Sequence, residues 1–521
     1  MRSTGLRSLA VTSFILLVLV LPRAVRGGNR PKYGGTLRVE LHVASVSLDP
    51  RDWRVGSTAA AEDERLATLI YDRLVTLDDY GRFQPALAAE WSHDAAEKNW
   101  QFKLRPGVKF SNGSLLTSSD VAKALQGLLP PPLQIIPGDN NLTIRSSRPV
   151  PDLLEQLASG RYFVFRKNPD GTFLGTGPFY LAENIPAQPA EANPAALKPA
   201  HLKFRANEEA WAGRPFVDTV EVTLGAPGLR QILDLQVGRA DLVEIAPDLV
   251  RKARQDNLRV CRSAPATLLA LRFDNSQHAA SDDRLREAID LALDRDTMAN
   301  VLLQREAQPA TALLPQWLTG YAFVFGSPMN LNRAREIRAA LPTNEAGTAE
   351  PLRLRVDAPG DVMKLLGERV AVNARQANLA VQVTPHAAQA NPPASPNPGS
   401  VAAGLHLVAW HYDSLSPRAE LEALVSQLYQ KDAFDTFPAY ADPDKLYAEE
   451  RRLLEQRRLL PLIALPDYVG IGPAVRNWSP APWGEWRLAD VWLEASESTT
   501  SGAPGESSGT NPKDRAPGVR P

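Results

Sequence analysis

The 521-residue sequence has very little cysteine and almost no net charge. Its single cysteine, Cys261, excludes an intrachain disulfide and any zinc site built from several cysteines. We expect Cys261 to be a small buried apolar residue rather than a reactive thiol. A formal net charge of -1 supplies no basic field for nucleic acid, so we expect no nucleic-acid partner.

Long apolar runs are missing except at the N-terminus. Arg2 and Arg7 precede an apolar run over residues 9–21, which Pro22 ends. A basic flank followed by about a dozen apolar residues is typical of a secretory signal and is short for a membrane-spanning helix. We therefore predict a signal peptide over residues 1–26 and a periplasmic protein. The expected cleavage point fits the small-x-small pattern poorly, so an uncleaved membrane anchor stays an alternative.

The rest of the sequence has an ordinary globular composition, with 44% hydrophobic and 22% charged residues. A chain of this length is expected to form two or three lobes rather than one core. Residues 184–200 and 387–400 are rich in proline and alanine and are predicted to be irregular surface excursions. Residues 496–521 lack apolar side chains to bury, which predicts a disordered tail.

Strand and helix patterns alternate between these segments. Residues 35–41, 100–104 and 219–224 alternate apolar and polar side chains, which predicts strands with one buried face. Residues 283–298 place apolar side chains at helical spacing, and Asp282 supplies a cap at the start. Interleaved strands and helices predict a mixed α/β fold.

Several short motifs follow one another in a characteristic order. The most diagnostic run is Trp-Gln-Phe-Lys-Leu-Arg-Pro-Gly-Val-Lys-Phe at residues 100–110, preceded by Glu-Trp-Ser at residues 90–92. Further motifs occupy residues 33–37, 47–50, 69–74, 112–113, 117–121, 175–179, 207–215, 238–242 and 283–295. In this order they resemble the family 5 extracellular solute-binding proteins, which include peptide and nickel receptors of ABC transporters. We expect these motifs to be markers of the fold rather than ligand contacts.

The resemblance implies a two-lobed α/β periplasmic binding protein fold of type II-like organisation, hinged so that the lobes close around a ligand. The larger lobe would comprise residues 33–262, with about 60–170 as a subdomain, and residues 467–495 would return to it. Residues 263–466 would form the second lobe. The chain is compact between residues 120 and 148, where peptide receptors usually have a longer subdomain, so we expect a reduced subdomain here.

The resemblance also places a selectivity element after a buried strand of the second lobe, here residues 405–409. Dipeptide-binding relatives carry Trp-x-x-Asp-x-x-Asp-Pro at this point, and the first Asp binds the ligand's α-amino group. Trp410 and Asp413 match the start of this pattern, whereas Ser416 replaces the second Asp. A buried carboxylate would bind an ammonium group and select against ligands without a cation. An ordinary Asx turn is the alternative role for Asp413.

Other residues near this element are candidates for the walls of the cleft. Flat side chains would bury apolar ligand area, and the candidates are Trp410, His411, Tyr412, Trp317 and Tyr321. Arg418 is a candidate partner for a ligand carboxylate, with a solvated arginine as the alternative. Ser47 is expected at the cleft edge of the first lobe. Trp410 has the alternative role of a core residue below the site.

The sequence contains no nucleophile elbow, zinc-protease motif or phosphate loop, so we expect no catalytic residues, no cofactor and no enzyme activity. The seven histidines show no paired helical spacing, so no metal site is expected. We expect a receptor that captures a small solute, a peptide above all, and delivers it to an ABC permease. It would be a monomer that meets the membrane only through the permease or an uncleaved signal anchor. A ligand-sensing or regulatory protein with the same fold is the alternative.

Overall fold

The structure is a computed structural model that describes most of the chain between residues 30 and 494. Inside that range it leaves out residues 79, 131–132, 191–192, 275–277, 322–324, 327–328, 343–350, 385–402 and 429–441. The predicted signal peptide, the predicted tail and the predicted excursion at 387–400 therefore lie outside the described residues. In the part that is described, no helix combines the length and the apolarity that crossing a bilayer requires.

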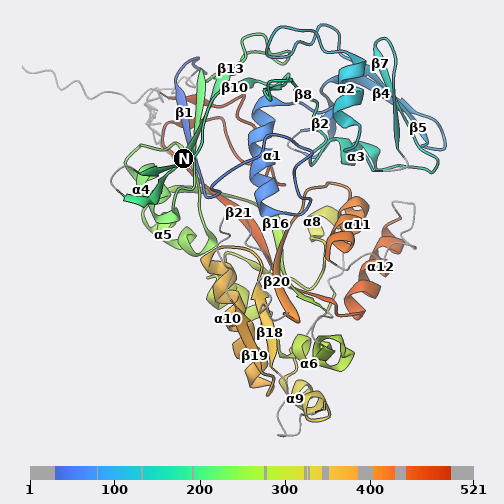
Figure 1. Ribbon diagram of the computed structural model, residues 1–521, viewed down its shortest axis with the longest axis vertical. Coiled ribbons are helices and arrows are strands. Elements are labelled where there is room, and N and C mark those ends of the chain that lie inside the picture. Colours follow the sequence, from blue (N-terminus) through green and yellow to red (C-terminus); the bar gives the residue numbers. More distant parts are fainter. Residues whose placement is uncertain are drawn as a thin grey trace, which may run out of the picture.

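One eleven-stranded sheet runs through both halves of the molecule. Its order is β10-β13-β14-β1-β15-β21-β16-β20-β18-β19, and β17 also pairs with β21. In the upper half of Figure 1, β1 (Thr36–Leu41) pairs in parallel with β14 (Thr219–Leu224) and β15 (Leu242–Glu244). In the lower half, β18 (Leu352–Val356) pairs in parallel with β20 (Leu405–His411). The predicted strands at 35–41 and 219–224 are confirmed.

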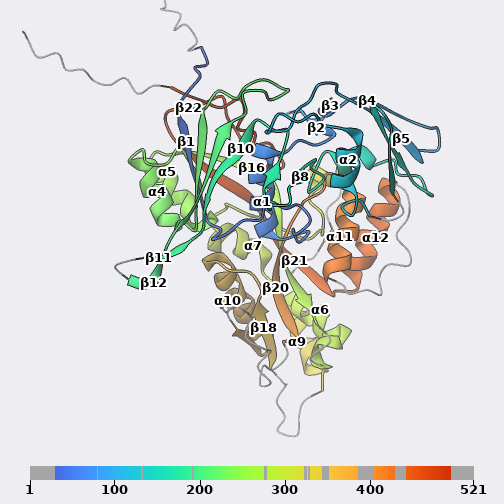
Figure 2. The ribbon, with the colours of Figure 1, turned by 45° about the horizontal axis from the view of Figure 1, so that its top comes forward.

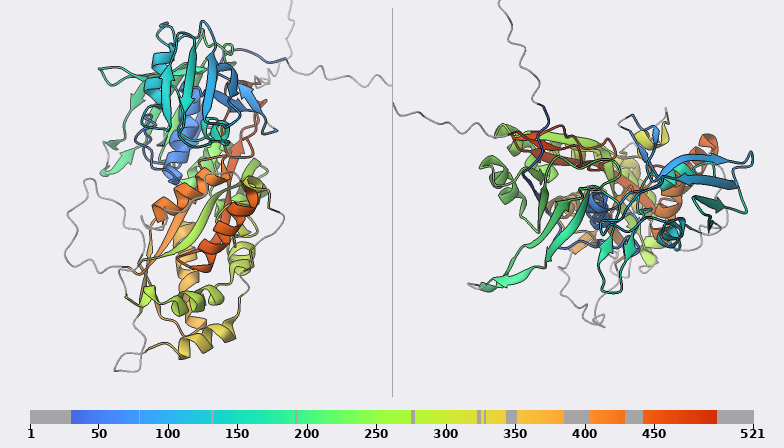
Figure 3. Two further views of the ribbon diagram at one scale, coloured as in Figure 1. Left: turned by 90° about the vertical axis from the view of Figure 1, so that its right-hand side faces the viewer. Right: turned by 90° about the horizontal axis from the view of Figure 1, so that it is seen from above.

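Two long strands, β16 (Arg259–Phe273) and β21 (Leu459–Ile471), carry the chain from one half to the other. They pair antiparallel, and the pairing register shifts on either side of Pro265, which lies opposite Pro466. Because proline has no N–H to give to a ladder, the two prolines weaken the sheet where it passes between the lobes. Figure 1 shows β16 and β21 running between the upper and lower halves of the molecule, and the side view in Figure 3 shows the same two halves one above the other.

Each half has its own hydrophobic core. The larger core combines β1, β13 (Ala200–Ala206), β14 and α1 (Thr58–Ile70) with residues from Val469 to Val491 near the end of the described chain. The second core combines β16, β18 and β20 with α6 (Asp283–Ala292) and α10 (Asp361–Gln376). Smaller clusters pack beside each of them, around α4 and α5 in the larger lobe and around Trp410 in the second. Separate cores in the two halves on one shared sheet confirm the predicted two-lobed α/β fold.

The larger lobe carries a small subdomain at the upper right of Figure 1. Its four-stranded sheet has the order β4-β5-β7-β6 and includes β5 (Asn99–Leu104), which confirms the strand predicted at 100–104. Among its described residues, the compact stretch between positions 120 and 148 holds the end of α2 (Ser118–Leu125) and the hairpin β6–β7. The other elements of this lobe are β2 (Val75–Leu77), β3 (Phe83–Pro85), β4 (Ala88–His93), β6 (Gln134–Pro137), β7 (Asn141–Arg145), α3 (Leu153–Leu157), β8 (Arg166–Lys167), β9 (Phe173–Leu174), β10 (Phe179–Ile185), α4 (Gly228–Gln236), η1 (Pro247–Leu249), α5 (Val250–Gln255), β22 (Val475–Arg476) and β23 (Trp492–Leu493).

Two segments differ from their sequence-based predictions. Residues 184–200 are not irregular, because β11 (Gln188–Ala190) and β12 (Asn193–Lys198) pair as a hairpin that projects from the larger lobe in Figure 2. The helix predicted over 283–298 ends at Ala292, because Asp294 accepts a bond from the Thr297 backbone and starts a new turn. The remaining elements of the second lobe are η2 (His278–Ser281), α7 (Arg295–Thr297), η3 (Met298–Leu302), β17 (Gln308–Pro309), α8 (Gln316–Thr319), α9 (Leu331–Ala339), β19 (Val381–Thr384), α11 (Pro417–Leu428) and α12 (Pro443–Glu455).

Candidate functional site

The loop between β20 and α11 is shaped by one buried carboxylate, that of Glu420. Its Oε1 accepts the indole N–H of Trp410 over 2.6 Å, and its Oε2 accepts the backbone N–H groups of Asp413 and Ser414 over 3.1 and 2.8 Å. Glu420 is fully buried, and burial raises its pKa to about 7 although these three bonds oppose the shift. These three hydrogen bonds hold the loop in place and so fix the orientation of the Asp413 side chain.

Asp413 points toward the larger lobe and has only half of its carboxylate satisfied. Oδ2 accepts the backbone N–H of Gly56 over 2.6 Å. Oδ1 is buried and has no hydrogen-bond partner among the described residues. Burial raises the pKa of Asp413 well above its ordinary value, and the nearby carboxylates of Glu420 and Glu64 raise it further. An enclosed, unpaired carboxylate oxygen is costly, and a cation placed beside it would remove that cost.

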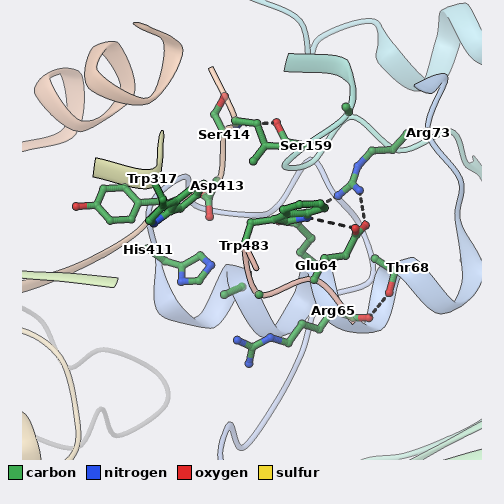
Figure 4. Close-up of a pocket in the computed structure, with 16 residues that line it drawn as sticks. Glu64, Arg65, Thr68, Arg73, Ser159, Trp317, His411, Asp413, Ser414 and Trp483 are labelled. Carbon is green, nitrogen blue, oxygen red and sulfur yellow. Dashed lines mark hydrogen bonds and ion pairs between the residues drawn. The ribbon is translucent and has the colours of Figure 1, made fainter. Parts of the chain in front are cut away.

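A cavity of about 30 Å³ lies beside Asp413 and is lined from both lobes (Figure 4). This volume holds one water-sized molecule, so the lobes are close together at this point. The larger lobe lines the cavity with Glu64, Arg65 and Arg73, among others, and the second lobe with residues that include Trp317 and His411.

The two arginines of this cavity are already paired. Arg73 donates to Glu485 over 2.9 Å and to the carbonyl of Gly160 over 2.8 Å, and it also pairs with Glu64. Arg65 pairs with Glu244 over 3.1 Å and also contacts Glu62 and Asp467. Their charges are therefore balanced inside the protein, whereas Oδ1 of Asp413 has no hydrogen-bond partner in the part of the chain that the structure describes.

Two larger spaces lie on either side of this cavity. One, of about 970 Å³, has two walls. The loop before α4 and the segment after β15 form one wall, and the loop between β18 and α10 forms the other. Its lining is mainly apolar, and it meets the small cavity at Arg65. The other, of about 460 Å³, separates residues 127–130, 133 and 160–162 of the larger lobe from α11. Asp413, Glu64 and Ser414 line both this space and the small cavity.

Trp410 lies in the core of the second lobe, below the site. Its ring packs on the backbone of Gly56, where a Cβ atom would lie 2.3 Å from the ring carbons. Gly56 also has φ +75, a conformation that favours glycine. Trp410 therefore supports the Gly56–Asp413 contact, and it does not line any of the three spaces described above.

His411, Tyr412 and Trp317 line the small cavity. The His411 ring is bonded to Thr267 over 3.2 Å, and burial lowers the pKa of His411 to about 4, so the ring is neutral near pH 7. The Tyr412 hydroxyl donates to the carbonyl of Leu313 over 2.9 Å. Trp317 donates its indole N–H to the carbonyl of Pro265, in the crossing strand, over 2.8 Å.

The remaining three candidates are placed farther from Asp413 or are engaged elsewhere. Arg418 pairs with Asp152 of the larger lobe over 3.0 Å and with Glu422 over 2.8 Å. The hydroxyl of Tyr321 is buried without a partner among the described residues, and its ring packs edge-on against Tyr447. Ser47 donates its backbone N–H to Asp63 and does not line the three spaces described above.

Sequence reasoning missed the contribution of α1 to the site. Glu64 and Arg65 lie on this helix, and Glu62 and Asp63 are also buried there. Four consecutive charged residues in a helix that otherwise buries alanine and leucine were the available signal, because buried charges need partners. Gly56 and Gly160 carried no comparable signal.

No group of three or more metal-binding side chains comes together in the described stretches between residues 30 and 494. His406 is bonded to Asp357 over 2.9 Å, and His411 to Thr267.

Comparison with known proteins identifies the family. A model described as "Bacterial extracellular solute-binding proteins, family 5 Middle" matches residues 82–431. The chain belongs to this family. Its members are substrate-binding proteins of transport systems, which act outside the cytoplasm.

Individual relatives are distant. The chain is 26% identical over 349 residues to the probable di/tripeptide-binding protein 5 of Pseudomonas aeruginosa, covering 60% of this chain and 64% of that protein. It is 22% identical to the nickel-binding protein NikA of Staphylococcus aureus, covering 55% of this chain and 56% of that protein. The matches thus span between about half and two thirds of these curated relatives.

The structural similarity to known proteins covers a larger share of the chain than the sequence similarity does. The solved structure of the Escherichia coli murein tripeptide-binding protein MppA superposes with a TM-score of 0.72 at 16% identity, covering 89% of this chain and 98% of that chain. At this identity the likeness supports the two-lobed family 5 fold and says nothing about the ligand.

Proposed function

We propose that this protein is an exported receptor that captures a small solute with a positively charged amine, a short peptide above all, and delivers it to an ABC permease. The observation that carries the proposal is the buried, unpartnered Oδ1 of Asp413, at a cavity lined from both lobes. A ligand ammonium would donate to Oδ1 while Gly56 continues to donate to Oδ2. The names of the similar peptide-binding proteins favour a peptide as the source of that amine.

Closure of the lobes around the ligand requires that the ligand contact both lobes. A ligand shifts the equilibrium between the open and closed states only if it binds the closed state more tightly than the open state. We propose residues 33–262 and 467–495 as the larger lobe and 263–466 as the second lobe. The crossing at Pro265 and Pro466 would act as the hinge. The protein would perform no chemistry on its ligand, act as a monomer and reach the periplasm through its N-terminal signal.

The test is isothermal titration calorimetry with the dipeptide Leu-Leu and its N-acetyl derivative. The free dipeptide is expected to bind, and acetylation should weaken binding at least about tenfold because it removes the ammonium. Asp413→Asn should cause a similar loss. The matched control is Asp139→Asn, which changes an exposed aspartate in the subdomain and should leave affinity unchanged.

Equal binding of the free and acetylated peptides, or unchanged affinity in D413N, would remove the amine contact from the site. Mass spectrometry of the ligand that remains bound to the purified protein would identify the natural solute independently.

A further inference from the structure

The helix α4, on the larger lobe, exposes an apolar stripe to solvent. Leu229, Leu233 and the C-cap residue Val237 follow one another at intervals of four, so they share one side of the helix, and they are 61%, 49% and 56% exposed. The helix also buries Ile232 and Leu235 in the core beside β15. A surface helix normally carries polar side chains on its outer side. Among the described helices, no other exposes three large apolar side chains.

The arginines of this region do not cover the stripe. The Nε atoms of Arg230 and Arg239 lie 3.0 and 2.8 Å from the carboxylate of Asp234, which is 2% exposed. Long basic side chains can shield apolar surface when their stems lie along it. Here the two guanidinium groups are held at a buried carboxylate instead, and the stripe stays open to solvent.

A second apolar patch lies nearby on the other lobe. Leu365 and Val372 of α10 are each 38% exposed and lie two turns apart on the helix. The N-terminal ends of α4 and α10 line the same space of about 970 Å³, through Leu229 and Lys364 among others. Figures 1 and 2 show α4 above α10 on the same side of the molecule. We call Leu229, Leu233, Val237, Leu365 and Val372 the α4–α10 surface.

The charges around the α4–α10 surface do not favour a lipid bilayer as the partner. Arg230 and Arg239 are exposed along much of their length, and α10 adds the exposed side chains of Asp361, Lys364 and Glu368. Both signs are therefore present, and no field of one sign is available to attract anionic lipid head groups. The apolar side chains are the part of this surface that a partner would recognise.

The size and the division of the surface indicate a partner that binds and releases. A permanent protein interface takes about 20 to 30 residues on each side, so five apolar side chains are too few for a stable dimer of this chain. The surface is shared between the two lobes, and opening about Pro265 and Pro466 would change the separation of its halves. A partner that contacts both halves would therefore recognise one arrangement of the lobes.

We propose that the α4–α10 surface docks on an apolar extracytoplasmic segment of the ABC permease. This inference rests on the proposed function and deepens it, because it names the surface through which the receptor meets its partner. Leu233, in the middle of the stripe, would be the main anchor, and Leu365 would add the contact from the second lobe. Neither residue lines the three spaces at the candidate site, so docking can be tested apart from ligand binding.

The first experiment replaces Leu233 by the photocrosslinking amino acid p-benzoyl-phenylalanine in the full-length protein, expressed in its native cells. Irradiation is expected to join the protein to a membrane-spanning subunit of the permease, identified by mass spectrometry. Leu115 is the matched control, because it is an exposed leucine, at 59%, that precedes α2 on the other side of the molecule in Figure 1. The crosslinker at position 115 should not reach that subunit.

Three outcomes of this experiment would overturn the proposal. Position 233 could join only a second copy of the chain or only lipid, it could join nothing, or position 115 could join the permease subunit equally well. The result does not depend on which solute the protein binds, so it stands apart from the amine contact proposed at Asp413.

The second experiment measures receptor-dependent uptake of the dipeptide Leu-Phe by cells. Leu233→Glu should lower uptake at least about tenfold, and Leu365→Glu severalfold, because each places a charge in an apolar contact. Calorimetric affinity for Leu-Phe should stay at the wild-type value in both. Leu115→Glu should change neither uptake nor affinity. If L233E does not fold, Leu233→Ser tests the same anchor and should lower uptake severalfold.

Unchanged uptake in the Leu233 variants would overturn the docking assignment, and unchanged uptake in L365E alone would overturn a surface shared by both lobes. Loss of calorimetric affinity equal to the loss of uptake would also overturn it, because the variants would then act on ligand capture. The proposed function fails separately: the wild type would then bind no Leu-Phe in calorimetry, whichever subunit position 233 joins.

Discussion

Gly56 donates its backbone N–H to the Oδ2 atom of Asp413 over 2.6 Å, although the two residues are 357 positions apart. The contact joins the larger lobe to the second lobe, and the backbone N–H of His411 returns a bond to the carbonyl of Gly56 over 2.8 Å. One carboxylate oxygen of Asp413 is therefore fixed by the protein, and the other has no hydrogen-bond partner among the described residues. On the proposed function, closing the lobes would also complete the ligand site.

A substitution at Gly160 tests whether contact between the lobes controls the affinity for a ligand. Gly160→Ala would place a methyl group 2.9 Å from the carbonyl oxygen of Asp413, so the lobes could not approach as closely. We expect a loss of Leu-Phe affinity of about tenfold or more, measured by calorimetry.

The matched control is Gly171→Ala. Gly171 also has a positive φ, +86, but no atom lies within 4 Å of a Cβ at that position. Both variants should lose about 1 kcal/mol of stability from backbone strain, and only G160A should lose affinity. Equal affinities in the two variants would show that the contact does not govern closure.

The ion pair between Arg418 and Asp152 connects α11 to the start of α3 across the two lobes. Arg418→Gln removes it and leaves Asp152, which is 4% exposed, without its charged partner. We expect the open state to gain population, which small-angle X-ray scattering would detect as a larger radius of gyration without ligand.

Glu422→Gln serves as the control, because Glu422 pairs with Arg418 within the same helix over 2.8 Å and does not cross between the lobes. Its scattering profile should match that of the wild type. An unchanged radius in R418Q would mean that the remaining contacts, such as that between Leu415 and Ser159, hold the lobes by themselves.

Ligand binding should depend on pH through Asp413. Burial, with Glu420 and Glu64 nearby, raises the pKa of Asp413 well above its usual value, so its protonated form persists at a pH where exposed aspartates are ionised. An ammonium ligand requires the ionised form, and its binding should therefore expel a proton.

Affinity for Leu-Phe should accordingly fall as the pH is lowered through the acidic range. Calorimetry in two buffers with different ionisation enthalpies would measure the released proton. D413N should show neither the proton release nor the pH dependence, and a wild type whose affinity is flat across this range would contradict the assigned role.

Glu450 affects stability rather than binding. Its Oε1 accepts the backbone N–H groups of Leu313 and Leu314 over 2.7 and 3.0 Å, whereas Oε2 has no partner in the described part of the chain. Burial raises the pKa of Glu450 from 4.5 to about 7. The folded state therefore holds a proton that the unfolded state has lost, and stability should fall as the pH rises from about 4.5 to about 7.

Above that range the buried charge costs on the order of 3 kcal/mol. Glu450→Gln keeps the accepting oxygen and removes the charge, so the urea midpoint at about pH 8 should rise relative to the wild type, with little difference at about pH 4.5. Glu449→Gln, one position earlier, should not reproduce the effect. A pH dependence of equal size in E450Q and in the wild type would count against the explanation.

The fold could be predicted where local pattern and packing agree. Residues 35–41, 100–104 and 219–224 alternate along one buried face and form strands as expected, because a strand's two faces can be read from neighbouring residues. The helix expected over 283–298 was cut short at Ala292, because the cap made by Asp294 depends on local geometry that apolar periodicity does not report.

The candidate site was predictable only in part. The family resemblance pointed to His411, which ends the buried strand β20, and to Asp413, which follows it, and both line the cavity. The engagement of Arg418 with Asp152 and of Trp410 with Glu420 could not, because neither partner is marked by a pattern near it in the chain.

The sequence by itself determined the alternation of strands and helices from neighbouring residues and the family from short motifs in their order along the chain. The resemblance to that family then singled out Asp413. Only the tertiary structure decided which charged side chains have a partner of opposite charge. Burial, lobe contact and pairing across hundreds of positions left Oδ1 of Asp413 without a hydrogen-bond partner among the described residues. An unmatched buried charge is a property of three-dimensional surroundings, because the free energy of a charge depends on what surrounds it and not on its neighbours in the chain.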